Sequence, residues 1–178
     1  MVADQNFPKV KSIVVTIFLV LFIATNSVAE EFNFKKIIDL KGPWGSTFIN
    51  NKELLITEKS GSIKLINLNT KKISNINHNL NFLEHGQGGL LDILYKNNFV
   101  YISYSENRGG GKTSTSIAKS KFNKKDFIFR NIFQANPPIN SGYHFGSRLA
   151  IKDDFLFASA GERGEGMIAQ DPTKHPGS

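Results

Sequence analysis

One histidine in this sequence stands in a position suited to acid–base chemistry. His144 lies between Gly142 and Gly146, just before an apolar stretch. A histidine is the usual general base near neutral pH, so His144 can take a proton from a hydroxyl group. The alternative is that His144 only hydrogen-bonds a neighbouring loop.

A second glycine-bounded segment, Gly161–Gly166, carries Glu162, Arg163 and Glu165. If the residues between His144 and this segment form a β-hairpin, Glu162 returns to the end where His144 lies. A carboxylate there can hold the imidazole in one tautomer and stabilise its charged form. A solvated loop is the alternative for these charges, and Arg163 and Glu165 fit it better than Glu162 does.

A third segment, His85–Gly89, has glycines on both sides of Gln87. Glycine lets a backbone approach a ligand closely, and the Gln87 amide can both donate and accept hydrogen bonds. Glycine-rich turns before strands are common, so a purely structural turn is the competing interpretation. Arg148, shortly after His144, can pair with Glu162 or with an anionic ligand.

Several other kinds of site are excluded. The chain has no Gly-x-Ser-x-Gly elbow, P-loop or dinucleotide fingerprint, which argues against an esterase, a nucleotidase and a nicotinamide enzyme. No His, Asp or Glu cluster has convincing metal spacing, and the absence of cysteine rules out disulfides and thiolate sites. The net charge of +7 is spread over single lysines and short pairs, which favours a solvated basic surface over nucleic-acid binding.

Short β-strands must position these side chains. Runs rich in β-branched and aromatic residues alternate with Gly, Asn, Asp and Lys clusters, and no helical apolar stripe lasts three turns, so the body is predicted to be all-β. The predicted strands are Thr47–Asn50, Glu53–Thr57, Ser62–Asn67, Leu90–Tyr95, Phe99–Ser103, Ser114–Phe122, Phe127–Phe133, Arg148–Lys152 and Phe155–Ala160.

A unit of glycine, strand, turn and strand occurs three times, beginning at Gly45, Gly89 and Gly146. The spacing, with a longer second interval, indicates a β-propeller, whose blades repeat every ~40–50 residues. Six blades would need roughly 240 residues, so the chain holds about two and a half and forms an incomplete propeller. Either it is a fragment or a partner supplies the rest; we favour truncation and expect the isolated piece to be weakly stable or aggregation-prone.

The N-terminus reads as an export signal. Lys9 and Lys11 precede the apolar run 13–24, and Ser27-Val28-Ala29 has the small-x-small pattern of a cleavage site. The sequence therefore predicts a signal peptide over residues 1–29, cleaved near Ala29, and a body over 30–178. The alternative is an uncleaved anchor, but the run is shorter than the roughly 20 residues that a spanning helix needs. We expect a periplasmic or secreted protein with no stable membrane association after cleavage.

In combination, the motifs resemble those of the soluble pyrroloquinoline quinone (PQQ)-dependent sugar dehydrogenases, of the glucose/sorbosone or aldose dehydrogenase type. The resemblance runs in order from about Ile37 to the last residue, and the ordered set is far more specific than any one motif. The matching segments are Gly42–Gly45, Leu54–Glu58, Gly86–Asp92, Tyr101–Ser105, His144–Leu149 and Ala169–Asp171.

This resemblance implies a six-bladed propeller exported to the periplasm, with PQQ over the central channel. It implies that Gln87 hydrogen-bonds the quinone and that His144 is the general base for the anomeric hydroxyl of an aldose sugar, while hydride passes to the quinone. An external electron acceptor completes the reaction. Glu162 falls where many members carry Asp and others Glu, which makes it the catalytic partner of His144. Arg148 lies in the matching motif and is assigned with Gln87 to cofactor binding, with its exact role left open.

The chain departs from the family at its end. His175–Ser178 stops in the middle of a motif, before the later blades that provide the calcium site, further basic contacts to the quinone and much of the sugar pocket. We therefore expect this polypeptide alone to be inactive. Two alternatives stay open: a calcium-dependent lactonase on a related propeller, and a non-catalytic propeller that only binds a ligand.

Overall fold

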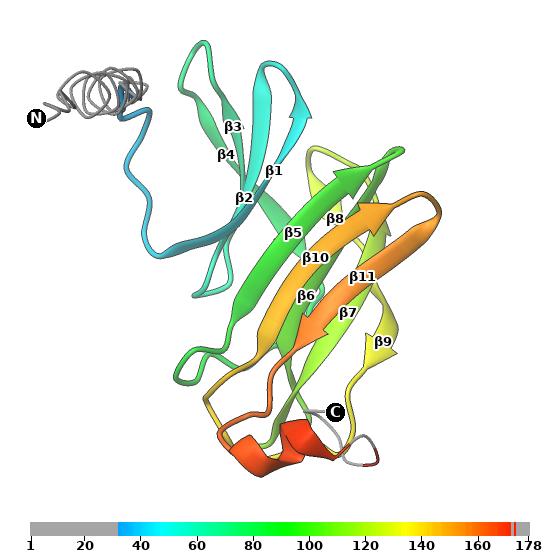
Figure 1. Ribbon diagram of the computed structural model, residues 1–178. Coiled ribbons are helices and arrows are strands. Elements are labelled where there is room, and N and C mark those ends of the chain that lie inside the picture. Colours follow the sequence, from blue (N-terminus) through cyan, green and yellow to red (C-terminus); the bar gives the residue numbers. More distant parts are fainter. Residues whose placement is uncertain (1–31, 172, 174–178) are drawn as a thin grey trace, which may run out of the picture. The chain divides into compact units, whose positions relative to one another are not determined.

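The computed structural model describes residues 32–171 and 173 (Figure 1). The predicted signal peptide lies outside these residues. Residues 32–36 have no regular secondary structure and belong to a different unit from Ile37–Ser178. Over the described ranges, no helix has the length and apolar character needed to cross a bilayer.

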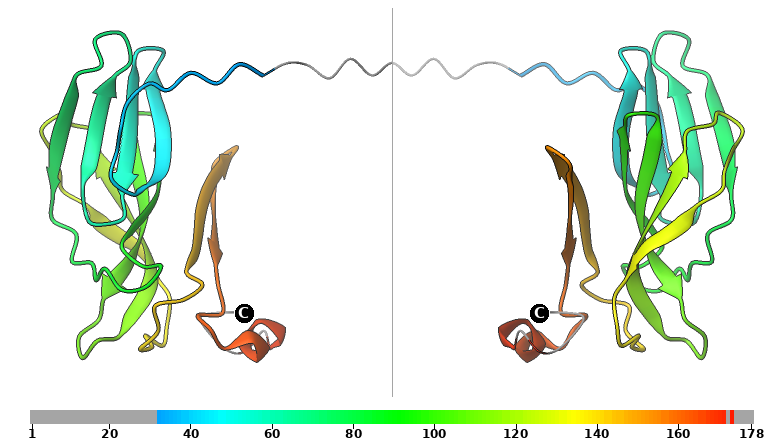
Figure 2. Two further views of the ribbon diagram at one scale, coloured as in Figure 1. Left: turned by 90° about the vertical axis from the view of Figure 1, so that its left-hand side faces the viewer. Right: turned by 90° about the vertical axis from the view of Figure 1, so that its right-hand side faces the viewer.

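Three β-sheets follow one another along the chain (Figure 2). The first contains β1 (Pro43–Asn50), β2 (Glu53–Glu58), β3 (Ile63–Asn67), β4 (Ile73–His78) and, parallel to β4, the short β8 (Asp126–Phe127). The second contains β5 (Leu90–Lys96), β6 (Phe99–Asn107), β7 (Thr113–Lys121) and β9 (Arg130–Gln134). The third is the hairpin of β10 (Gly146–Lys152) and β11 (Phe155–Ala160), which precedes the 3₁₀ helix η1 (Gly166–Gln170).

This arrangement confirms the all-β, incomplete propeller that the repeat predicts. β1–β4 and β5–β7 with β9 are two antiparallel four-stranded blades, and β10–β11 is the inner hairpin of a third. The turn between β5 and β6 shows why the sequence folds in this way. Asn97 and Asn98 have φ angles of 50° and 63°, which suit a tight type I′ turn and are tolerated best by Asn and Gly.

The first strands of the three sheets are neighbours, with β5 between β1 and β10. Each of these hairpins has a register shift near its start, between Pro43 and Ser46, between Leu90 and Ile93, and between Gly146 and Leu149. A β-bulge locally bends a strand and re-aims its side chains. The three bulges all lie at the end of the sheets from which the candidate segments emerge.

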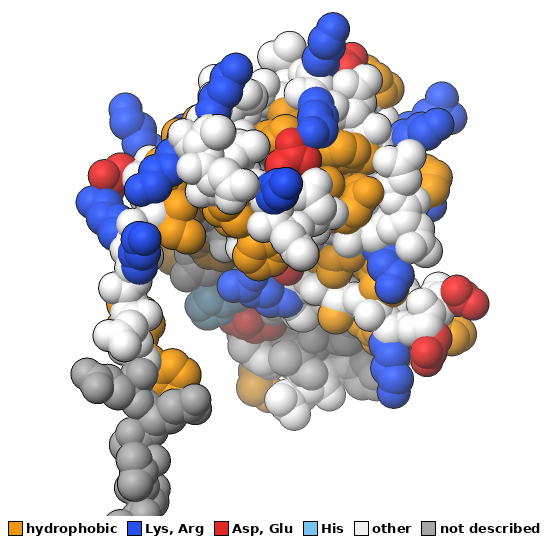
Figure 3. Space-filling model, turned by 90° about the horizontal axis from the view of Figure 1, so that it is seen from above, with side chains coloured by type: hydrophobic (Ala, Val, Ile, Leu, Met, Phe, Trp, Pro, Cys, Tyr) orange, Lys and Arg blue, Asp and Glu red, His pale blue; other side chains and the backbone are white. Residues whose placement is uncertain are grey.

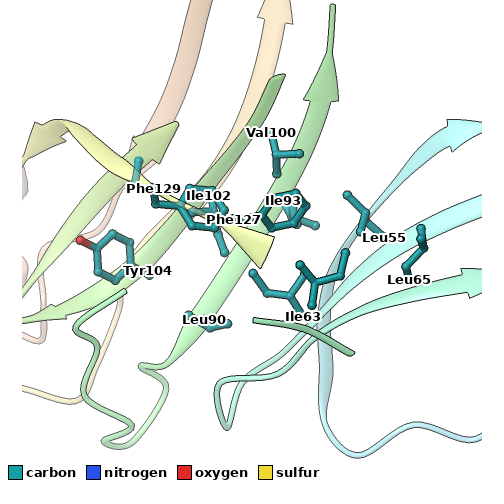
Figure 4. Packing of buried hydrophobic residues seen from close by; sticks show 12 residues of the cluster. Leu55, Ile63, Leu65, Leu90, Ile93, Val100, Ile102, Tyr104, Phe127 and Phe129 are labelled. Carbon is teal, nitrogen blue, oxygen red and sulfur yellow. The ribbon is translucent and has the colours of Figure 1, made fainter. Parts of the chain in front are cut away.

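The hydrophobic core draws on the first two sheets (Figure 4). Phe127 of β8 is fully buried in it, and its ring meets that of Phe129 edge-on at 5.4 Å. Asn79 fixes the same segment, because its side chain accepts a hydrogen bond from Phe129 N at 2.8 Å and donates one to Phe129 O at 3.1 Å. The connection between β7 and β9 thus crosses from the second sheet to the first.

Two parts of the strand prediction are wrong. The strand Ile73–His78 was not predicted, because it is largely polar and only Ile76 is buried. The single predicted strand Phe127–Phe133 is two short strands, since β8 pairs with the first sheet and β9 with the second. Figure 3 shows one face of the molecule, over which lysine and arginine side chains are scattered, in agreement with their spacing in the sequence.

Truncating a core side chain should measure how much the sheet packing stabilises the protein. Ile102 in β6 is fully buried, whereas Ile132 in β9 is 51% exposed. We expect Ile102→Ala to lower the free energy of unfolding by about 2–5 kcal/mol, because it leaves a cavity. Ile132→Ala, the matched control, should cost less than about 1 kcal/mol in the same denaturant titration of the intact protein. Equal losses would contradict the assigned core.

Candidate functional site

Three predicted residues from separate segments meet in one cluster. The backbone N–H of His144 donates a hydrogen bond to Gln87 Oε1 at 2.8 Å. The His144 ring bonds through Nδ1 to Glu162 Oε1. The β10–β11 hairpin explains the second contact, because Gly146 pairs with Ala160 and so brings the segments before and after it together. The predicted return of Glu162 to His144 is confirmed.

The backbone around His144 is unusual for a residue with a side chain. His144 has a φ of 48°, in the left-handed region that few non-glycine residues adopt. Gly161 lies close against this backbone, and a side chain at Gly161 would collide with the carbonyl group of His144. Backbone conformations of this kind persist where surrounding contacts enforce them, and they cluster at functional sites.

The Gln87 loop is joined to the His144 loop by backbone contacts. A side chain at Gly86 would come within 2.5 Å of the Gly142 carbonyl oxygen. The two segments therefore cross too closely for any residue but glycine at this position. Gln87 N donates a hydrogen bond to that same carbonyl at 2.7 Å. Lys59 supports the loop from the other side, with Nζ 2.5 Å from the Gly86 carbonyl oxygen.

The carboxylate–imidazole pair determines the electrostatics of the cluster. The hydrogen bond from His144 lowers the pKa of Glu162, which keeps the carboxylate ionised at neutral pH. The His144 side chain is 52% exposed and that of Glu162 is 20% exposed. In the described part of the chain, neither His144 Nε2 nor the Gln87 amide nitrogen has a hydrogen-bond partner. Both atoms are therefore available to a ligand.

Arg163 is not the solvated loop charge that the sequence suggests. Arg163 is 1% exposed, and its guanidinium carbon lies 3.7 Å from the centre of the Phe145 ring. Arg163 Nε donates a hydrogen bond to the Tyr143 carbonyl at 3.0 Å. Solvation by the protein thus replaces solvation by water, and the expectation for Arg163 is wrong.

Arg148 takes no part in the cluster. Its Nη1 lies 3.3 Å from Asp92 Oδ1, and its backbone N–H bonds to Ser159 Oγ. The structure therefore pairs Arg148 with Asp92 rather than with Glu162. The Arg148 side chain is nonetheless 72% exposed, so much of its guanidinium stays open to a ligand.

Sequence reasoning missed the roles of Asp92 and Arg163. Asp92 is buried within β5, where it accepts hydrogen bonds from Ile93 N at 3.0 Å and Leu149 N at 2.8 Å. A signal for it exists, because an acidic residue inside an apolar strand has to find buried partners. Arg163 offers no such signal, since a charged residue between an acidic residue and a glycine looks like any exposed turn.

Titration of Glu162 should report directly on its bond to His144. Because the pKa of Glu162 is lowered, its carboxylate stabilises the folded state when the pH is above 4.5, the ordinary pKa of Glu. This stabilisation is lost as the pH falls through the lowered pKa. We expect a carboxyl carbon NMR titration of the intact protein to give a midpoint below 4.5 for Glu162. In His144→Ala the midpoint should rise towards 4.5. An unchanged midpoint in that variant would contradict the bond.

Known proteins resemble the chain along most of its length. The profile of the family Glucose / Sorbosone dehydrogenase matches residues 40–178. Aldose sugar dehydrogenase YliI of Escherichia coli (strain K12) is 30% identical over 148 residues, which cover 78% of this chain and 40% of that protein. A crystal structure of glucose dehydrogenase is 31% identical with a TM-score of 0.73, over 79% of this chain and 44% of the other.

A more distant solved structure agrees in fold. It is the PQQ-bound form of aldose sugar dehydrogenase from Streptomyces coelicolor, 21% identical with a TM-score of 0.65, over 75% of this chain and 42% of the other. The chain spans less than half the length of each of these relatives. The predicted resemblance is confirmed, and the chain belongs to the glucose/sorbosone dehydrogenase family.

Proposed function

We propose that this chain is the N-terminal part of a six-bladed propeller enzyme that oxidises aldose sugars at the anomeric carbon with PQQ as its cofactor. The observation that carries the proposal is the cluster of Gln87, His144 and Glu162, in which neither His144 Nε2 nor the Gln87 amide nitrogen has a hydrogen-bond partner among the described residues. The relatives support the substrate class, since the similar proteins are named as aldose sugar and glucose dehydrogenases.

The residues present fit a quinone. An amide nitrogen on Gln87 and an imidazole on His144 are hydrogen-bond groups that suit carbonyl and carboxylate oxygens. A relative has been solved in its PQQ-bound form. Gln87 would hold the cofactor, and the exposed guanidinium of Arg148 is a candidate contact to its anionic groups. When bound, the quinone supplies the electrophilic carbonyl that accepts hydride from the anomeric carbon.

His144 moves the proton in this reaction. Its Nε2 takes the proton of the anomeric hydroxyl as the carbon–hydrogen bond breaks, so the aldose leaves as a lactone, oxidised by two electrons. Glu162 holds Nδ1, which fixes the ring orientation and leaves Nε2 as the base. The lowered pKa of Glu162 keeps its negative charge beside the imidazolium that forms.

The remaining parts of the proposed enzyme lie beyond the described residues. Those residues contain no group of His, Cys, Asp or Glu side chains that could hold a metal ion, so the ligands of the proposed calcium would come from elsewhere in the protein. An external electron acceptor would take up the two electrons. We further propose that the protein works in the periplasm or after secretion, and that this polypeptide alone is inactive.

Replacing the base should separate catalysis from binding. The protein to assay is the full-length enzyme of which this chain is the proposed N-terminal part. Supplied with PQQ and calcium, it should oxidise aldoses with an artificial electron acceptor. His144→Ala should lower kcat by about a hundredfold or more, the scale of a lost general base. Glu162→Gln should lower kcat less.

Glu165→Gln is the matched control for Glu162→Gln, because Glu165 lies in the same loop but is exposed. Its activity should equal that of the wild type. If the wild type binds no quinone and oxidises no sugar, the proposal fails and a propeller that only binds a ligand becomes the better description.

A further inference from the structure

We propose that Arg163 is a positioning residue, which sets the placement of His144 relative to Glu162 by tying the two loops together through its hydrogen bonds, as a clamp. The inference rests on the proposed function for its catalytic meaning. Its structural content stands on the contacts of Arg163 alone.

The guanidinium makes hydrogen bonds to two other segments. Towards the His144 loop, Nε donates to the Tyr143 carbonyl at 3.0 Å and Nη2 to the Ser141 carbonyl at 2.5 Å. Towards β7, Nη2 donates to Thr113 Oγ1 at 2.7 Å and Nη1 to the Thr113 carbonyl at 3.2 Å. The Glu162 loop, the His144 loop and the second blade therefore meet at one planar group.

The contact is reciprocal. Ser141 Oγ donates a hydrogen bond to the Arg163 carbonyl at 2.5 Å. Arg163 itself has a φ of 60°, so the chain bends back immediately after Glu162. The peptide that joins Tyr143 to His144 is thus held on its carbonyl side by Arg163, while the ring of His144 is held by Glu162.

The clamp extends to the third member of the cluster. Arg163 holds the carbonyls of Ser141 and Tyr143, which flank Gly142. The carbonyl of Gly142 accepts the hydrogen bond of Gln87 N at 2.7 Å. Any shift of the clamped segment therefore moves the contacts of Gln87 as well as those of His144.

A buried arginine is a costly way to fill space. No acidic side chain among the described residues forms an ion pair with Arg163, so its charge is balanced by carbonyl dipoles and the face of Phe145. Burial lowers the pKa of Arg163 to about 10, which still leaves it protonated at neutral pH. An apolar side chain would fill the volume without the desolvation cost. What it would lack is the rigid fork of donors that ties several carbonyls together.

The test compares Arg163→Lys and Arg163→Met with Arg130→Met in the intact protein. Lysine keeps the charge but loses the fork, methionine keeps the volume, and Arg130 is exposed on β9. The first measurement is the carboxyl titration of Glu162 without cofactor. We expect its midpoint to rise towards 4.5 in both Arg163 variants and to stay at the wild-type value in Arg130→Met.

The second measurement is kinetic. With PQQ bound, we expect both Arg163 variants to lower kcat by about tenfold or more with little change in KM, since misplaced catalytic groups slow the chemical step. The loss should shrink when Glu162→Gln is already present, because the two residues act through one contact.

Variants with wild-type titration of Glu162 and wild-type kcat, but lower unfolding free energy, would overturn the proposal and leave Arg163 a purely structural residue. If both Arg163 variants fail to fold, Ser141→Ala removes the reciprocal bond together with the hydrogen bond that Ser141 Oγ accepts from Tyr143 N at 3.2 Å, and it should shift the Glu162 midpoint in the same direction. No shift in Ser141→Ala would then count against the clamp. The titration needs neither quinone nor sugar, so a failure of the proposed function leaves this result readable.

Discussion

Neighbouring blades of this protein are held together by hydrogen bonds between side chains of one blade and the backbone of the next. Asp92 is buried in β5 and accepts the N–H of Leu149 in β10, and Thr57 donates to the carbonyl of Leu91 in β5. Hydrophobic packing between sheets has no preferred register, whereas these bonds have one, because a buried carboxylate or hydroxyl without its partner is costly. Gln87 and His144 stand just before β5 and β10, the two strands that are anchored in this way. Contacts between neighbouring blades therefore determine where these residues lie.

The cluster itself combines an accessible pair of side chains with a buried charge. The ionised carboxylate of Glu162 bonds the half-exposed imidazole of His144, and the cation of the next residue, Arg163, is buried. The pair is open to a ligand, whereas the guanidinium is sealed from water. Such an arrangement keeps the exposed ring in one orientation, while the backbone around it is held in a conformation that it would not adopt by itself.

Much of this could be predicted from the sequence. Strand β4 was missed because it is largely polar, and the other exceptions share a different cause. The three glycine–strand–turn–strand units and the return of Glu162 to His144 follow from local patterns, since hairpins are made by residues close in the chain. Strand β8 and the buried state of Arg163 depend on segments far away: β8 pairs with β4 of the first sheet, and Arg163 is buried because Thr113 and the residues before His144 supply its acceptors. The local sequence around such a residue does not indicate its distant partners.

The short strand β8 has a consequence for how the chain becomes structured as it is synthesised. Its residues Asp126 and Phe127 pair with the outer edge of β4, although they belong to the connection that follows β7. The outer edge of the first blade therefore stays open until nearly all of the second blade has left the ribosome. Phe127 then closes the core that both blades share. The two blades therefore complete their folding together, because the strand that covers the outer edge of the first blade is synthesised after most of the second blade.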